Sequence, residues 1–356
     1  MKRLIICCDG TWNSPENEGL APSNVVRLAR AVLPTASDGA HQVVYYDPGV
    51  GSGNLIDRLT GGAFGTGLSL NVREAYRFIV HNYEPGDSLY FFGFSRGAYT
   101  VRSTAGFVRT IGVIRKVHSG QISEGWKLYR KRGVKVDRPD TEDFRSKYSH
   151  PNSASIDLRC IGVWDTVGTL GIPGVIGSLN PPKFLDFLNR SNEFHDVALS
   201  SRVKFGFQAV AVDEKRKFFK PTLWEQSLEA KDQVLEQVWF PGVHADVGGG
   251  NKDPALADNT FLWMVAGAKR AGLEFDEDYL ANFRTNPHGR IHESLNGIYR
   301  RFGRHDRPIG QPVEKPAYTP PGETHQTLSG ETEARFKEDA SYRPPELVKY
   351  LARRGE

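Results

Sequence analysis

The fold is decided by residues 88–99, which read SLYFFGFSRGAY. This is a short apolar run that stops at Gly-Phe-Ser-Arg-Gly and then continues with residues typical of a helix. A serine at a sharp turn from strand to helix has a strained backbone that tolerates only small neighbours, which explains Gly93 and Gly97. The stretch therefore predicts a nucleophile elbow with Ser95 at its tip.

Two predicted strands and two predicted helices precede this stretch. The apolar runs at residues 4–8 and 43–46 are typical of buried strands. Apolar residues recur at helical spacing over 25–32 and again over 68–80. An alternating order of strands and helices implies right-handed crossovers and a parallel sheet with helices on both faces. The sequence therefore predicts an α/β fold.

The second half of the chain continues this pattern. Apolar runs at residues 157–164, 205–212 and 238–240 predict three further strands. Apolar spacing over 261–268 predicts a helix that packs on the sheet. We expect a mostly parallel central sheet with lid-like insertions, which is the α/β-hydrolase fold that a nucleophile elbow accompanies.

The remaining segments are predicted as insertions in one domain that spans residues 1–356. Residues 115–155 are polar and basic, which predicts a surface insertion. Residues 171–200 are unusually apolar for a connection and predict a lid, although a core helix is an equal alternative for 184–188. From about residue 303 the chain is rich in proline, glycine and charge, which predicts a C-terminal arm on the surface.

Composition and charge place the chain among ordinary globular proteins. Of 356 residues, 39% are apolar and 25% are charged, and the formal net charge is +4. This small excess suits anionic surfaces, and we expect no nucleic-acid partner because no basic block resembles a nucleic-acid-binding arm. Cys7, Cys8 and Cys160 lie in apolar runs, which indicates buried thiols in a reducing compartment.

No apolar run is long enough for a signal sequence or a transmembrane span. We therefore expect a cytoplasmic location, and any export would use a route that reads no cleavable signal.

Polar residues at the ends of three predicted strands form a candidate catalytic site. Acyl transfer needs a nucleophile, a base that takes its proton and an acid that orients the base. In α/β-hydrolases these occur in the order Ser, Asp or Glu, His, each at the carboxyl end of a strand. Ser95, Asp165 and His244 meet both conditions. Asp213 and Asp246 also follow strands and remain alternative acids.

The oxyanion hole is predicted from the same register. The amide that follows the nucleophile, that of Arg96, is one expected donor. The second donor comes from the loop after the strand that lies two before the nucleophile strand, and here that loop begins with Gly10 and Thr11.

No metal or cofactor is expected. His288 and His292 have the spacing of two ligands on one helical face, but Pro287 and Gly289 interrupt that helix. Residues 49–53 are rich in glycine, yet no Gly-Lys-Ser/Thr follows as a phosphate loop would require. The chemistry predicted for the serine site also requires no cofactor.

Several motifs together resemble a known family. They are CDGTWN at 8–13, YDPGVG at 46–51, GFSRGAY at 93–99, VWDTVG at 163–168, WFPGVHADVGG at 239–249 and YRPP at 342–345. With them the chain resembles the α/β-hydrolase domains whose best-known members are phospholipase effectors of bacterial type VI secretion systems. The Arg between Ser and Gly of the elbow is quite specific to that family.

The resemblance implies Ser95 as nucleophile, His244 as base and Asp165 as acid. It also implies an ester hydrolase that acts on glycerophospholipids and makes transient contact with membranes, and it leaves a secretion or immunity partner open. Membrane-acting members typically carry large extra segments, whereas this chain is close to the bare hydrolase core, so the resemblance supports hydrolysis more firmly than it supports a lipid substrate. The alternatives are a soluble carboxylesterase for small esters and a hydrolase-like module that binds a partner without catalysis.

Overall fold

We describe the chain from a computed structural model. The description covers residues 1–10, 21–49, 61–131, 137–152, 156–167, 198–217, 219–230, 232–314, 316–318 and 320–355, without the side chains of 61–66, 298 and 302. The predicted lid at 171–200 and the glycine-rich loop at 49–53 lie largely outside the described residues.

A seven-stranded parallel sheet forms the centre of the molecule, in the order β2-β1-β3-β4-β6-β8-β9. Its strands are β1 (Lys2–Cys8), β2 (His41–Asp47), β3 (Ser88–Phe94), β4 (Asp157–Trp164), β6 (Val203–Ala211), β8 (Val234–Phe240) and β9 (Gln326–Leu328). A second, two-stranded sheet pairs β5 (Ala198–Leu199) with β7 (Glu225–Gln226). The α/β-hydrolase fold predicted from the sequence is confirmed, and parallel pairing brings the carboxyl ends of all seven strands to one edge.

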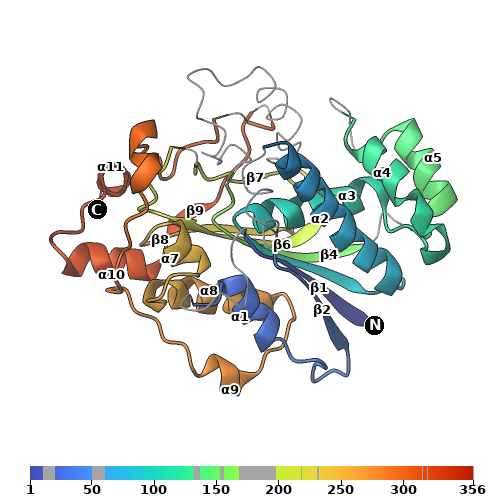
Figure 1. Cartoon of the computed structure of the whole chain (residues 1–356), viewed down its shortest axis with the longest axis horizontal. Helices are drawn as coiled ribbons and strands as arrows, with labels where there is room; N and C mark the ends of the chain where they lie inside the picture. The colour runs from blue at the N-terminus through green and yellow to red at the C-terminus, as the bar shows by residue number, and fades with distance from the viewer. Residues whose placement is uncertain are drawn as a thin grey trace.

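Helices cover both faces of the sheet (Figure 1). Helices α2 (Gly61–Asn82) and α3 (Arg96–Ile111) pack on the face that Leu4 and Ile6 of β1 point to. Helices α1 (Asn24–Ala31) and α8 (Ala255–Arg270) pack on the opposite face, with Ile5 and Cys7. Because successive side chains of a strand alternate between faces, one apolar run supplies two cores. This explains why the strands read as continuous apolar runs.

The segment predicted as a polar surface insertion contains helices that pack on the core. It contains a 3-10 helix η1 (Lys116–Gln121) and the helices α4 (Ile122–Tyr129) and α5 (Pro139–Tyr148). Buried Ile122, Leu128 and Phe144 join these helices to the core next to α3. Ile122, Trp126 and Tyr129 recur at helical spacing, but polar and charged residues dominate the segment and obscure this pattern.

The prediction of a surface arm after residue 303 was wrong for much of that segment. Strand β9 extends the central sheet beyond β8, and α10 (Gly330–Glu338) and α11 (Pro345–Arg354) follow it. Ile309, Leu347 and Leu351 form a third apolar cluster with Trp239 of β8. Proline and surface charge dominate the composition here and conceal the few residues that are buried.

Candidate active site

The turn that carries Ser95 joins β3 to α3 and has the strained backbone expected of a nucleophile elbow. Ser95 has φ 56° and ψ −117°, outside the regions that non-glycine residues prefer. A Cβ at Gly93 would lie 2.5 Å from the carbonyl oxygen of Gly97, and a Cβ at Gly97 would overlap the carbonyl group of Cys8. Both positions therefore require glycine, because α3 starts directly against β1 and β3.

The structure brings two of the predicted residues into direct contact. Asp165 follows β4, and His244 is the first residue of α7 (His244–Gly248), which follows β8. The Nδ1 atom of His244 lies 2.5 Å from Oδ2 of Asp165, and both side chains are buried. This hydrogen bond fixes the ring so that Nε2 is the nitrogen left to exchange a proton.

Ser95 lies next to this pair. The ring of Phe94, the residue before it, stacks at a centroid distance of 4.6 Å on the ring of His244, and Phe219 packs edge-on against the same imidazole at 5.0 Å. Within the described part of the chain, Ser95 Oγ makes no hydrogen bond. Hydrogen bonds between a nucleophile and its base commonly tighten only when substrate is bound.

The alternative acids are bound to other partners. Asp213 accepts hydrogen bonds from the amide of Gly242 at 2.7 Å and from the hydroxyl of Tyr342 at 3.0 Å. Burial raises the pKa of Asp213 to about 6. Asp246 accepts from the amide of Val243 at 3.0 Å and lies 2.6 Å from Nδ1 of His292. Neither carboxylate is hydrogen-bonded to His244.

Arg307 completes the site and was missed by the sequence analysis. Its two terminal nitrogens donate to both oxygens of Asp165, at 2.6 and 3.0 Å, and its side chain is 1% exposed. The amide of Ala211 donates to the same carboxylate at 3.0 Å. Arg307 is 142 residues from Asp165 in the chain and lies in the segment predicted as a surface arm, so no local pattern pointed to it.

These contacts set the charges of Asp165 and His244. Burial alone would raise the pKa of Asp165, but the Arg307 guanidinium and the His244 hydrogen bond hold it below its ordinary value. Burial lowers the pKa of His244 below its ordinary value, and Asp165 only partly opposes this. At neutral pH the pair is therefore a carboxylate and a neutral imidazole, which is the form that can accept a proton.

Glu214 holds the backbone of His244 from the other side and was also missed. Its carboxylate is buried and accepts from the amide of His244 at 3.2 Å and from the hydroxyl of Ser294 at 2.9 Å. Arg216 donates to both oxygens of Glu214, and its guanidinium stacks 3.4 Å above the ring of Phe219. The imidazole of His244 is thus held through its ring, its backbone amide and the aromatic residues around it.

The predicted oxyanion hole needs one correction. The amide of Gly10 donates to Oδ1 of Asp9 at 2.7 Å, so it is engaged within the chain. Asp9 is 1% exposed and also accepts from the hydroxyls of Ser23 and Tyr46. Thr11 lies outside the described residues, and Arg96 is the first residue of α3, as predicted.

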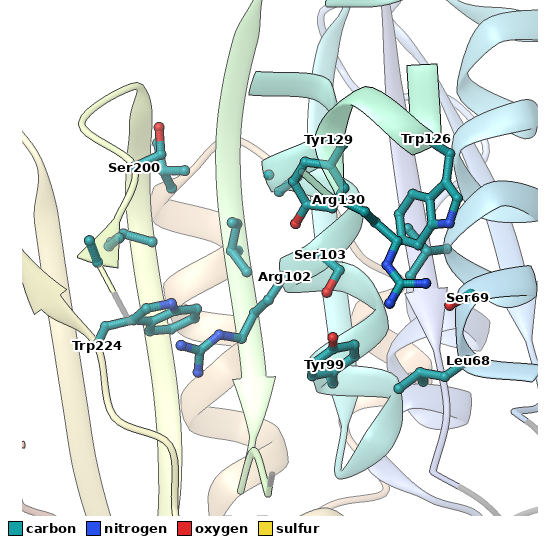
Figure 2. A pocket seen from close by; sticks show the side chains of 17 residues that line it. Leu68, Ser69, Tyr99, Arg102, Ser103, Trp126, Tyr129, Arg130, Ser200 and Trp224 are labelled. Atoms are coloured by element: carbon teal, nitrogen blue, oxygen red, sulfur yellow. The ribbon is translucent and has the colours of Figure 1, made fainter. Parts of the chain in front are cut away.

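A pocket beside α3 is not large enough to extend this site. It is about 50 Å³ in volume, which is room for one or two water molecules. As Figure 2 shows, Tyr99, Arg102 and Ser103 of α3 face it from one side, and Trp224 lies beyond Arg102. The guanidinium of Arg102 stacks 4.4 Å above the ring of Trp224. We therefore place no substrate group in this pocket.

The described residues contain no group of three or more His, Cys, Asp or Glu side chains able to hold a metal ion. His288 pairs with Glu338 and His292 with Asp246. In the same part of the chain, no helix is both long and apolar enough to cross a membrane.

Replacing Arg307 with methionine is expected to shift the acid limb of the kcat/KM profile to higher pH. In the predicted triad, His244 accepts a proton only when its imidazole is neutral, and its lowered pKa places the wild-type limb below pH 6.5. Without the guanidinium, Asp165 is a buried carboxylate with the imidazolium as its nearest counter-charge, so the pKa of His244 rises. We also expect the free energy of unfolding to fall by about 3–5 kcal/mol, because a buried ion pair loses one partner.

Hydrolysis of a soluble nitrophenyl ester between pH 5 and 9 measures the limb, and thermal unfolding measures the stability. Arg304→Met is the matched control. Arg304 lies three residues before Arg307, but it is exposed and pairs with Asp306. An acid limb that stays in place in Arg307→Met would show that the cation does not act on the base.

Residues 2–267 match the family model described as the catalytic domain of Tle1-like phospholipase effectors of type VI secretion systems. An uncharacterized protein of Saccharomyces cerevisiae is 29% identical over 197 residues, which are 48% of this chain and 27% of the yeast protein. The chain therefore spans about a quarter of the length of this curated relative.

Two solved structures are similar at low sequence identity. An uncharacterized protein from Pseudomonas aeruginosa is 17% identical with a TM-score of 0.45, covering 78% of this chain and 47% of that one. A butyrate-bound esterase from the planctomycete Thermogutta terrifontis is 11% identical with a TM-score of 0.36. The match covers 76% of this chain and 84% of the esterase. The family match extends over about three quarters of the sequence and includes Ser95, Asp165 and His244. The chain belongs to the family of Tle1-like phospholipase effector catalytic domains.

Proposed function

We propose that the chain is a serine hydrolase that cleaves acyl esters of glycerophospholipids through an acyl-enzyme on Ser95. The observation that carries the proposal is the buried contact of Asp165 with His244 beside a strained elbow at Ser95. Membership of a phospholipase family supports the lipid as substrate.

In the proposed first step, Ser95 Oγ attacks the carbonyl carbon of the ester while Nε2 of His244 takes the hydroxyl proton. The amide of Arg96, at the start of α3, stabilises the oxyanion of the tetrahedral intermediate together with an amide of the loop after β1. The intermediate collapses to an acyl-enzyme, and the leaving alcohol, a lysophospholipid, takes the proton from His244. Water then attacks the acyl group with the same base, releasing a fatty acid and restoring Ser95.

Asp165 and Arg307 act through His244. Asp165 holds the proton on Nδ1 and stabilises the imidazolium that forms in each step. Arg307 keeps Asp165 ionised and in place by binding both of its oxygens. No step of this chemistry requires a cofactor.

Fatty-acid release from phospholipid vesicles tests the proposal. We expect the wild-type chain to release fatty acid from vesicles of long-chain phosphatidylglycerol and phosphatidylcholine, and the Ser95→Ala variant to release none above background. Matched short-chain nitrophenyl esters are assayed at the same enzyme concentration. Serine-dependent cleavage of the short esters alone would overturn the lipid assignment in favour of a soluble carboxylesterase. Inactivity on both substrates would overturn the hydrolase assignment and favour a module that binds a partner without catalysis.

A further inference from the structure

Two segments beside the base carry more positive charge than the whole chain. Residues 214–220 contain four Lys or Arg and one Glu, and residues 297–307 contain four Arg and one Asp. Their combined formal charge is +6, whereas the complete chain carries +4. Asp165 offsets one of these charges by pairing with Arg307. Each segment carries a net formal charge of +3, so the chain beside His244 is locally cationic.

The two segments lie side by side. Arg216 and Arg304 form an antiparallel bridge, and the amide of His305 donates to the carbonyl oxygen of Lys215 at 2.9 Å. The rings of Phe219 and Tyr299 pack edge-on at 6.0 Å. A single surface is therefore built from parts of the chain that are about eighty residues apart.

This surface borders the proposed catalytic residues. Phe219 packs against the imidazole of His244. Burial lowers the pKa of Arg96, the residue after Ser95, to about 10, and the neighbouring Tyr299 counteracts that effect. Phe219 and Tyr299 thus connect the charged segments to His244 and to the elbow.

The charges at the outside of this surface are mostly cations, and we call them the cationic rim. The rim consists of the exposed residues Lys217, Lys220, Arg300, Arg301 and Arg304. Lys220 pairs with Glu314 and Arg304 with Asp306, both in exposed pairs that add little binding energy. Among the described residues, Lys217, Arg300 and Arg301 take part in no ion pair. The exposed carboxylate nearest to them in sequence is that of Glu293.

We propose that the cationic rim docks the catalytic edge of the protein on the surface of an anionic phospholipid bilayer. This inference rests on the proposed function, because an enzyme whose substrate lies in a bilayer must present its site to that bilayer. An anionic surface attracts nearby Lys and Arg side chains, by about fivefold in partition coefficient for each cation, and the attraction is screened by salt. The rim therefore favours anionic membranes over zwitterionic ones.

The experiment compares the double variant Arg300→Gln/Arg301→Gln with a matched control. The control is Arg30→Gln/Lys116→Gln, which removes two exposed cations. Arg30 lies in the last turn of α1, and Lys116 begins η1, after α3. Both helices run back from the catalytic edge, so these cations lie toward the opposite edge of the sheet. Binding is measured by sedimentation in the Ser95→Ala background, with vesicles of phosphatidylcholine alone or with about 30% phosphatidylglycerol.

We expect the rim variant to bind phosphatidylglycerol vesicles roughly tenfold or more weakly than the control. With Ser95 intact, the rim variant and the control should have the same kcat/KM on a soluble nitrophenyl ester. Binding by the control should also fall as salt is raised from about 0.05 to 0.5 M. Equal binding of anionic vesicles by the rim variant and the control would overturn the proposal.

A second comparison separates docking from recognition of a single substrate molecule. Hydrolysis of monomeric dibutyryl-phosphatidylglycerol, below its aggregation concentration, should be the same in the rim variant and the control. An equal loss on monomers and on vesicles would place the cations in substrate recognition and overturn docking. If the wild type hydrolyses no ester at all, the proposed function fails while the sedimentation result still reports on docking.

Discussion

The Ser95→Ala variant is expected to lose at least about 10⁴-fold in kcat for ester hydrolysis while remaining folded. Oγ of Ser95 is the atom that would carry the acyl group. Alanine is smaller than serine, so it meets no new contact at the elbow. The backbone strain at φ 56° is present in both proteins. The loss should therefore be chemical and not structural.

Initial rates on short-chain nitrophenyl esters measure this loss, and circular dichroism and thermal unfolding establish the fold. Ser103→Ala is the matched control because Ser103 lies about two turns into α3, the helix that Ser95 precedes, and is 7% exposed, as Ser95 is. Retention of more than about one hundredth of the activity by Ser95→Ala would show that another nucleophile does the chemistry.

The Asp165→Asn variant is expected to lose about 10⁴-fold in kcat, whereas Asp213→Asn should lose less than about tenfold. An amide at position 165 offers its NH₂ or its carbonyl to Nδ1 of His244, which disturbs the tautomer and removes the charge that stabilises the imidazolium. Asp213 binds the amide of Gly242 and the hydroxyl of Tyr342, and it is not hydrogen-bonded to His244.

The stabilities of the two Asn variants should change in opposite directions. Asp165→Asn leaves Arg307 as a buried cation without its carboxylate, which lowers the free energy of unfolding. The pKa of Asp213 is raised in the folded state, to about 6. Its ionisation therefore lowers the free energy of unfolding as pH rises from about 4 through about 6. Asn does not ionise, so Asp213→Asn avoids this loss of stability above about pH 6. Chemical unfolding at pH 5 and pH 8 measures both effects. Similar kcat losses in the two variants would contradict the assignment of Asp165 as the acid.

Much of the architecture could be predicted because it depends on local patterns. Strands of a doubly covered parallel sheet are apolar on both faces, so β1, β3 and β4 are visible as continuous runs. Since parallel strands end at one edge, residues that follow different strands converge there. This explains why Asp165 and His244 could be placed near each other although 79 residues separate them.

What could not be predicted depends on contacts without a local signal. Strand β9 is only three residues long and two of them are polar, so it has no apolar run. Arg307 lies among prolines and charges, and only the folded chain shows that it is buried against Asp165. The amide of Gly10 could donate to an oxyanion or to the carboxylate of Asp9. It donates to Asp9, and the register of the strand does not determine which acceptor it binds.

The late position of Arg307 in the chain has a consequence during protein synthesis. A nascent chain that has grown to residue 267, where the family match ends, already contains Ser95, Asp165 and His244 but not the guanidinium that pairs with Asp165. At about 5–20 residues per second, the ribosome needs several more seconds to add Arg307 and then β9. We therefore expect Asp165 to lack the ion pair that fixes its carboxylate until Arg307 has been added, so the site reaches its final geometry only late in synthesis.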